Sequence, residues 1–124
     1  MSMRLLNGAV LILGLLLAQV AHAQPPMNVQ IQVNFLLGYV EGSGCEFYRN
    51  GSWYDSKAAQ SHLRDKYNYL ADKNAINTAD DFIARAATVS SFSGQPYQVR
   101  CNGGATLTSS QWLHQELARF RTFQ

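Results

Sequence analysis

The stretch "GCEFYRNGSWYD", residues 44–55, decides more about the fold than any other part of the sequence. Its Asn50-Gly51 pair stands between two aromatic pairs. Asn-Gly in such a setting is the strongest short-range signal of a β-hairpin, because both central residues of a type I′ turn need a positive φ. The residues expected to face one another across the two strands are Phe47, Tyr48, Trp53 and Tyr54. Since two strands alone are barely stable, the hairpin needs a third strand or a helix against it.

The segment "YQVRC", residues 97–101, is the expected third strand. It ends at Cys101, and Cys45 stands at the entrance of the hairpin. In an oxidising compartment these two cysteines have one intramolecular connectivity. Closing the long loop between them stabilises the fold by roughly 3 to 4.5 kcal/mol in the chain-entropy model. Because no C-x-x-C spacing suggests redox chemistry, we predict a structural disulfide.

The sequence also predicts helices. Residues 29–41, "VQIQVNFLLGYVE", begin with strand-like alternation, but their length and later spacing favour a helix that ends at the glycines of 42–44. Residues 56–73 form an amphipathic helix capped by Asp55 or Ser56. Thr78 caps a third helix, and Ser109 or Ser110 caps a last one over 111–123. The expected fold is therefore α+β: a small, mainly helical domain of about four helices with a β-hairpin, a third short strand and one disulfide.

The first 23 residues have the pattern of a signal peptide. Arg4 precedes the apolar run "AVLILGLLLAQV", and "AHA" at 21–23 provides the small residues that signal peptidase recognises. A transmembrane span is disfavoured, because the run is shorter than the ~20 residues a span needs. We therefore expect cleavage after Ala23, no stable membrane anchor afterwards, and a single small domain over 24–124, of which 24–28 is a disordered lead-in.

Charge and composition exclude several functions. The chain has 10 Lys and Arg against 8 Asp and Glu, and no basic run that would indicate nucleic-acid or anionic-membrane binding. After cleavage only His62 and His114 remain to bind a metal beside two paired cysteines, which is too few for a zinc site. No Gly-rich phosphate loop is present. We expect no metal, no cofactor and no nucleic-acid partner.

Three features are candidates for a functional site. His62, at the border of the apolar stripe of its helix, is either a general base or a histidine satisfied by the backbone or a tyrosine, and His114 is expected to be exposed. Arg49, flanked by Tyr48 and expected near Trp53, is suited to a carboxylate or a sugar ring, or else packs over the aromatic rings at the surface.

The third feature is the loop before the third strand, "SFSGQPYQVRC". Ser93 and Gly94 make it tight, and Pro96 stiffens it. A rigid loop one strand away from a disulfide is well placed to present side chains to a partner. The alternative is that Ser93 only makes a turn and Tyr97 packs inward.

Several blocks resemble a known family: "LLGYVEGSGCEFYRNG", "AAQSHLRDKY", "TADDFIARAATVSSFSGQPYQVRC" and "WLHQEL". They are similar to the YfeK-like family of small exported proteins from Gram-negative bacteria, a domain of unknown function. The resemblance extends from Val33 to Leu117. It implies a periplasmic location and a paired Cys45 and Cys101, and it implies no activity.

A second similarity concerns the loop alone. Bacterial periplasmic lysozyme inhibitors present an S-G-x-x-Y loop to the lysozyme cleft, and Ser93, Gly94 and Tyr97 have that spacing. Those inhibitors are β-rich, whereas this chain is predicted to be mainly helical.

Together these features predict a non-enzymatic periplasmic binding or inhibitor protein. Its partner would be an envelope protein that degrades peptidoglycan, or a cell-wall fragment. The expected contacts are Arg49, Trp53, Ser93, Gly94 and Tyr97. Two alternatives remain: a small periplasmic hydrolase that uses His62 as its base, and an immunity or accessory protein that caps a toxin.

Overall fold

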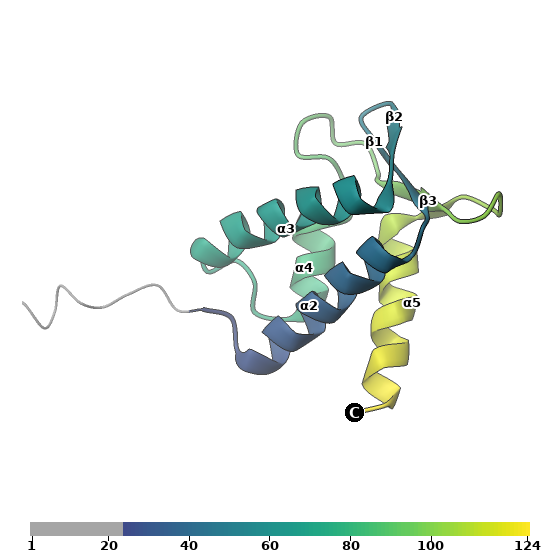
Figure 1. Ribbon diagram of the computed structural model, residues 1–124. Helices are drawn as coiled ribbons and strands as arrows, with labels where there is room; N and C mark the ends of the chain where they lie inside the picture. Colours follow the sequence, from purple (N-terminus) through teal and green to yellow (C-terminus); the bar gives the residue numbers. More distant parts are fainter. Residues whose placement is uncertain (1–23) are drawn as a thin grey trace, which may run out of the picture.

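Helices and one small antiparallel sheet make up the part of the chain that the structure describes (Figure 1). This computed structural model describes residues 24–124, so the predicted signal peptide lies outside the described residues. The helices are α2 (Met27–Gly42), α3 (Ser56–Asp72), α4 (Ala79–Ala86) and α5 (Ser109–Thr122). The strands are β1 (Glu46–Arg49), β2 (Ser52–Tyr54), β3 (Gln98–Arg100) and β4 (Leu107–Thr108). The predicted α+β class is confirmed.

The hairpin of β1 and β2 has the predicted turn. Asn50 and Gly51 have φ values of 51° and 88°, the left-handed conformation that a type I′ turn requires. The register places Phe47 opposite Tyr54 and Tyr48 opposite Trp53. The four aromatic residues are therefore the cross-strand partners that the sequence predicts.

The third strand and the disulfide are also as predicted. β3 pairs with β1, with Glu46 opposite Arg100, so Cys45 and Cys101 occupy the next position of the same register. They form a disulfide with their Cα atoms 4.4 Å apart. The bond therefore joins two neighbouring strands at one end of the sheet.

β4 was not predicted from the sequence. Leu107 pairs with Val99 and Thr108 with Gln98, which gives the sheet order β2-β1-β3-β4. A strand of two residues is too short to show an alternating pattern. Its presence also corrects the predicted cap of α5: Thr108, extended at the end of β4, accepts a hydrogen bond from the Gln111 N–H, whereas Ser109 and Ser110 are already helical.

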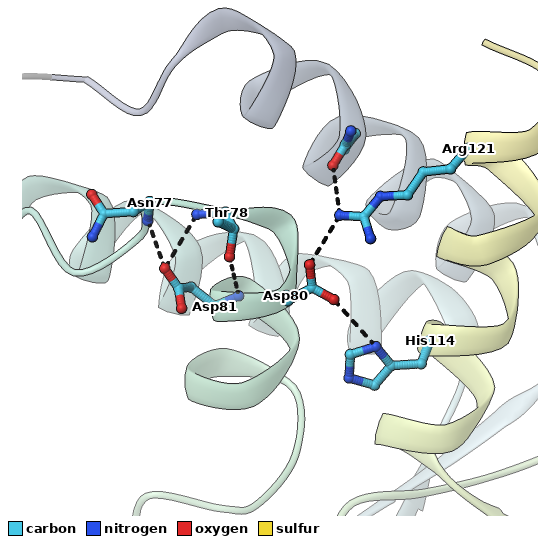
Figure 2. Close-up of polar contacts among 7 residues, drawn as sticks. Asn77, Thr78, Asp80, Asp81, His114 and Arg121 are labelled. Atoms are coloured by element: carbon cyan, nitrogen blue, oxygen red, sulfur yellow. Dashed lines mark hydrogen bonds and ion pairs between the residues drawn. The ribbon is translucent and has the colours of Figure 1, made fainter.

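The starts of α3 and α4 follow the sequence signals. The Asp55 carboxylate accepts from the Ala58 N–H at 2.8 Å. Thr78 and Asp81 form a capping box in which each side chain accepts a hydrogen bond from the backbone N–H of the other (Figure 2). These caps depend on residues three positions apart, so the local sequence is enough to specify them.

α2 is a helix, as predicted, but it starts earlier than expected. Met27 is its first residue, and the Gln30 side chain donates to the Pro25 carbonyl at 2.7 Å, so the predicted disordered lead-in over 24–28 is wrong for its later residues. The helix faces the core with a continuous stripe: Val29, Gln32, Val33, Leu36, Leu37 and Val40 are buried.

The short helix α4 lies at the centre of the helical layer and contacts α2, α3 and α5. It is amphipathic, and its inward face consists of Ala79, Phe82, Ile83 and Ala86, all fully buried. The sheet lies at one end of this layer (Figure 1). Trp112 of α5 packs edge-on against Phe47, with ring centroids 5.5 Å apart, and so covers the inner face of the sheet.

Candidate functional site

Polar side chains from three segments meet beside the hairpin, at the middle of α3. Arg49 is the last residue of β1, His62 and Lys66 lie on α3, and Tyr97 directly precedes β3. His62 Nε2 is 3.1 Å from the Tyr97 hydroxyl, and Lys66 Nζ donates to the same hydroxyl at 3.0 Å. Arg49, His62 and Lys66 are called the basic cluster below.

The repeats of the helix and of the strand place these side chains on facing surfaces. His62 and Lys66 are four residues apart on a helix and therefore share one face. Arg49 is two residues beyond Phe47 on β1, so its side chain emerges on the same inner face of the sheet. Tyr97 is held by its backbone: its N–H donates to the Thr88 carbonyl, and its carbonyl accepts from Ser109, both at 2.9 Å.

Burial and neighbouring charge shift the pKa values in the cluster. Burial lowers the pKa of His62, the charges of Arg49 and Lys66 lower it further, and Asp65 opposes them. Burial and then Arg49 lower the pKa of Lys66. Burial raises the pKa of the Tyr97 hydroxyl, against the effect of Arg49. His62 is therefore mainly neutral at pH 7, beside two cations.

These protonation states suggest the direction of the hydrogen bonds. Lys66 carries only donors, so the Tyr97 oxygen accepts from it. The Tyr97 O–H can then donate to Nε2 of a neutral His62, which leaves the His62 proton on Nδ1. The interpretation of His62 as a histidine satisfied by a tyrosine agrees with this geometry, and Nε2 is already occupied.

Two hollows flank His62 and Lys66. The first, of about 200 Å³, is also lined by Arg49, Asn50, Ser90, Ser91, Phe92 and Tyr97. The second, of about 270 Å³, is also lined by Asp65, Tyr69, Leu70, Arg85 and Ser91. Because both hollows share His62, Lys66 and Ser91, the pair of side chains on α3 is accessible from two sides.

The loop over residues 90–96 forms one wall of the first hollow and is held by hydrogen bonds. The buried Ser90 hydroxyl accepts from the N–H groups of Phe92 and Ser93, at 3.1 and 3.2 Å. The Ser93 hydroxyl donates to the Asn50 side-chain oxygen at 2.6 Å, which ties the loop to the hairpin turn beside it (Figure 1). Gly94 has a φ of 74°, so this loop needs glycine there. Phe92 is 91% exposed at its tip.

The predicted contact residues do not all share one surface. Arg49 lies on the same side as His62 and Tyr97, next to the loop that contains Ser93 and Gly94. Trp53 is on the opposite face of the sheet, because it alternates with Tyr54. Its ring lies 3.8 Å from the Arg100 guanidinium.

This arrangement corrects the expectation that Arg49 lies near Trp53, and for Tyr97 it agrees with the alternative that the ring packs inward. The Arg49 guanidinium is 4.5 Å from the ring of Tyr54 and is not stacked on Trp53, since strand alternation puts Arg49 and Tyr54 on one face. Tyr97 is only 6% exposed and packs inward, with its hydroxyl directed at His62 and Lys66. The S-G-x-x-Y spacing therefore does not present its tyrosine to a partner here.

His114 belongs to a separate polar contact between α4 and α5. The Asp80 carboxylate lies 3.6 Å from His114 Nδ1 and accepts from Arg121 at 2.9 Å (Figure 2). Arg121 also donates to the Gln32 side chain on α2 at 3.2 Å. This contact joins three helices. Residues 24–124 contain no group of three or more His, Cys, Asp or Glu that could hold a metal ion.

Sequence reasoning missed Lys66 and Arg85, and it included Ser91 and Phe92 only as part of the candidate loop. The i, i+4 spacing of His62 and Lys66 was a signal for Lys66, since it places both on one helix face. Nothing local indicated that Phe92 stays exposed, because this depends on how residues 90–96 fold back against the hairpin turn.

The fold and the basic cluster define a class of protein: a small disulfide-linked α+β domain with a basic site beside its hairpin. The chain belongs to the family of unknown function DUF5329, whose model matches residues 27–121. It is similar to the uncharacterized protein YfeK of Salmonella typhimurium, with 33% identity over 87 residues that cover 69% of this chain and 71% of that protein. The resemblance drawn from the sequence is thereby confirmed. No solved structure matches the chain.

One observation bears on the compartment. The disulfide is typical of an oxidising environment and is consistent with export. Among the helices of residues 24–124, none has the length and apolar character to cross a membrane.

Proposed function

We propose that this protein is a non-enzymatic binding protein of the periplasm, exported by residues 1–23 and cleaved after Ala23. Its partner is an envelope protein, an enzyme that acts on peptidoglycan being the first choice, or a cell-wall fragment. The contact surface is the turn–loop edge, which consists of Asn50, Gly51 and residues 90–96. Ser93 and Gly94 lie within this edge and Arg49 lies beside it. Trp53 and Tyr97 are left out of the surface.

The observation that carries the proposal is an exposed aromatic ring on a loop that is already ordered. Phe92 is 91% exposed, yet its N–H donates to the Ser90 hydroxyl within the loop, and the Ser93 hydroxyl donates to the Asn50 side chain and so holds the loop against the hairpin turn. A rigid loop loses little conformational entropy on binding, and aromatic anchors contribute strongly to protein interfaces. The disulfide between β1 and β3 restrains the strand from which the turn extends.

A hydrolase that uses His62 remains the second candidate, supported by the hollows beside the imidazole. The geometry favours it less, because the Tyr97 hydroxyl occupies Nε2. An immunity or accessory protein would use the same edge, and its toxin would be found as a stoichiometric partner. His62→Ala with full activity on any substrate found would dispose of the hydrolase.

The test is a capture experiment with oxidised protein purified from the periplasm of cells that express the full chain. Its mass reports whether cleavage follows Ala23. Wild type, Phe92→Ala and the control Phe123→Ala are each incubated with periplasmic extract, and with purified lysozymes as separate baits. Phe123 is a suitable control because it is also an exposed aromatic residue, 81% exposed, at the end of α5.

We expect wild type and Phe123→Ala to retain one specific partner and Phe92→Ala to lose it at least tenfold in affinity, the effect of a hot-spot aromatic residue (about 1.4 kcal/mol or more). Equal retention by Phe92→Ala would contradict the turn–loop edge as the surface. If the wild type retains no protein and also fails to bind soluble cell-wall fragments, the proposed binding function is contradicted.

A further inference from the structure

We infer that the basic cluster is a binding site for a peptide carboxylate, which lies between the Arg49 guanidinium and the Lys66 ammonium in the first hollow. The inference deepens the proposed function and rests on it for the biological source of the carboxylate. The two sources are an acidic side chain of a protein partner and the free chain end of a cell-wall peptide.

The charges of Arg49 and Lys66 have no counterion within residues 24–124. Three arginines elsewhere in these residues do have one: Arg100 pairs with Glu46, Arg119 with Glu116 and Arg121 with Asp80. Lys66 Nζ donates to two neutral oxygens, the Val89 carbonyl at 3.2 Å and the Tyr97 hydroxyl at 3.0 Å. An ammonium has three donors, so one N–H remains for a ligand.

Both cations are held in place before any ligand arrives. The two neutral acceptors fix the Lys66 ammonium, and its side chain also passes over the Tyr97 ring, with Nζ 5.0 Å from the centroid. The Tyr54 ring covers one face of the Arg49 guanidinium. Because stacking uses the face, it leaves the N–H edge of Arg49 free for a carboxylate, which such a fork binds in a bidentate manner.

Electrostatics favours an anion in this position. The pKa of Lys66 is lowered by burial and by Arg49, so the two cations repel each other in a half-buried setting. A carboxylate between them would relieve that repulsion, and charge-assisted hydrogen bonds are about twice as strong as neutral ones. Asp65 lines the second hollow, as Arg85 does, and no acidic residue lines the first.

The volume of the first hollow favours a single chemical group as its ligand rather than a complete small molecule. The first hollow, at about 200 Å³, is smaller than the ~300–1,000 Å³ of sites that enclose a complete ligand. It suits a carboxylate with a short apolar stem, which Phe92 and the edge of Tyr97 can contact. The rest of the peptide would then lie over the turn–loop edge.

The test is an NMR titration of the isotope-labelled protein, purified as above, with three probes. N-acetyl-Gly-Glu-Gly-amide carries one side-chain carboxylate, N-acetyl-Gly-Gln-Gly-amide is its neutral match, and N-acetyl-Ala-Ala with a free chain end represents the second source. Inorganic phosphate is titrated separately. The signals followed are the His62 imidazole and the backbone amides of residues 49, 66, 90–95 and 97.

We expect saturable shifts with one or both carboxylate peptides and none with the glutamine peptide. Which of the two binds more tightly identifies the source. Arg49→Gln and Lys66→Gln should each weaken binding about tenfold or more. Lys66→Arg keeps the charge and should bind within about threefold of wild type, which shows that a loss in Lys66→Gln does not come from misfolding.

The controls are matched by element. Lys57→Gln removes an exposed lysine from the same helix, and Arg100→Gln removes an arginine from the outer face of the same sheet. Both should bind as wild type does. Equal shifts with the glutamine peptide, tighter binding of phosphate, or an equal loss in the controls would overturn the site. These assays use no protein partner, so their failure while Phe92-dependent capture persists would remove the carboxylate site alone.

Discussion

Each face of the small sheet has an arginine beside an aromatic ring, but only the arginine on the outer face has a carboxylate partner among the described residues. On the outer face, Arg100 stacks on Trp53 at 3.8 Å and is neutralised by Glu46 at 2.9 Å. On the inner face, Arg49 stacks on an aromatic ring in the same way, but neither it nor Lys66 has a carboxylate partner among the described residues. The outer arrangement is complete by itself, whereas the inner one has room and charge for a ligand. A cation beside an aromatic ring therefore indicates a site only when its counterion is missing.

The largest expected loss of stability comes from removing the disulfide, because both faces of the sheet depend on it. Cys45→Ala with Cys101→Ala should lower the free energy of unfolding by roughly 4 kcal/mol, because the unfolded chain regains the entropy of a long loop. Urea denaturation of the double variant and of the oxidised and reduced wild type measures this. The reduced wild type should match the double variant. A loss below about 1 kcal/mol would show that β1 and β3 hold their register without the disulfide.

The next effect distinguishes the two faces directly. Tyr97→Phe removes the hydroxyl that joins His62 to Lys66 and should cost about 1 kcal/mol, the usual net value of a hydrogen bond. Tyr48→Phe is the matched change on the outer face and should cost close to nothing, because the half-buried Tyr48 packs on Trp53 through its ring. Chemical denaturation of both variants measures the difference. Equal losses would mean that the hydroxyl network of the inner face adds no stability.

The smallest expected effect is a pH dependence that arises from His62. Its folded-state pKa lies below the unfolded value of about 6.5, so the unfolded chain binds the proton first as the pH falls. The stability that a neutral His62 contributes is therefore complete above about pH 6.5 and is lost as the pH falls towards the folded-state pKa. His62→Gln should lose less unfolding free energy between pH 7 and pH 5 than wild type does, in denaturation curves at several pH values. The same slope in both proteins would contradict the unfavourable charging of His62.

Much of the fold could be predicted because its signals are local. The φ requirement of Asn50-Gly51 is a property of two residues, and the cap of α4 depends on Thr78 and Asp81, three positions apart. The disulfide needed only two cysteines and an oxidising compartment. β4 was not predicted because a strand of two residues shows no alternating pattern. Without it, nothing in the sequence favoured Thr108 as the cap of α5, and the following serines were predicted instead.

The site could be predicted only as separate residues. Arg49, His62 and Tyr97 were each recognised as candidates, but Trp53 was grouped with them because it is close in sequence, although strand alternation places it on the other face. Phe92 was included only as part of its loop and was not singled out, because its exposure depends on the hydrogen bond between Ser93 and Asn50, 43 residues apart.

The sequence by itself determined the hairpin, the disulfide pair, the starts of α3 and α4 and the family, because each depends on neighbouring residues or on a unique pairing. Only the tertiary structure decided that His62 and Lys66 share one hydroxyl, since Tyr97 lies 35 and 31 residues further along the chain. It also decided which cations have a counterion. That outcome depends on the register of β1 against β3 and on the packing of α3 against the sheet, and no local pattern encodes either.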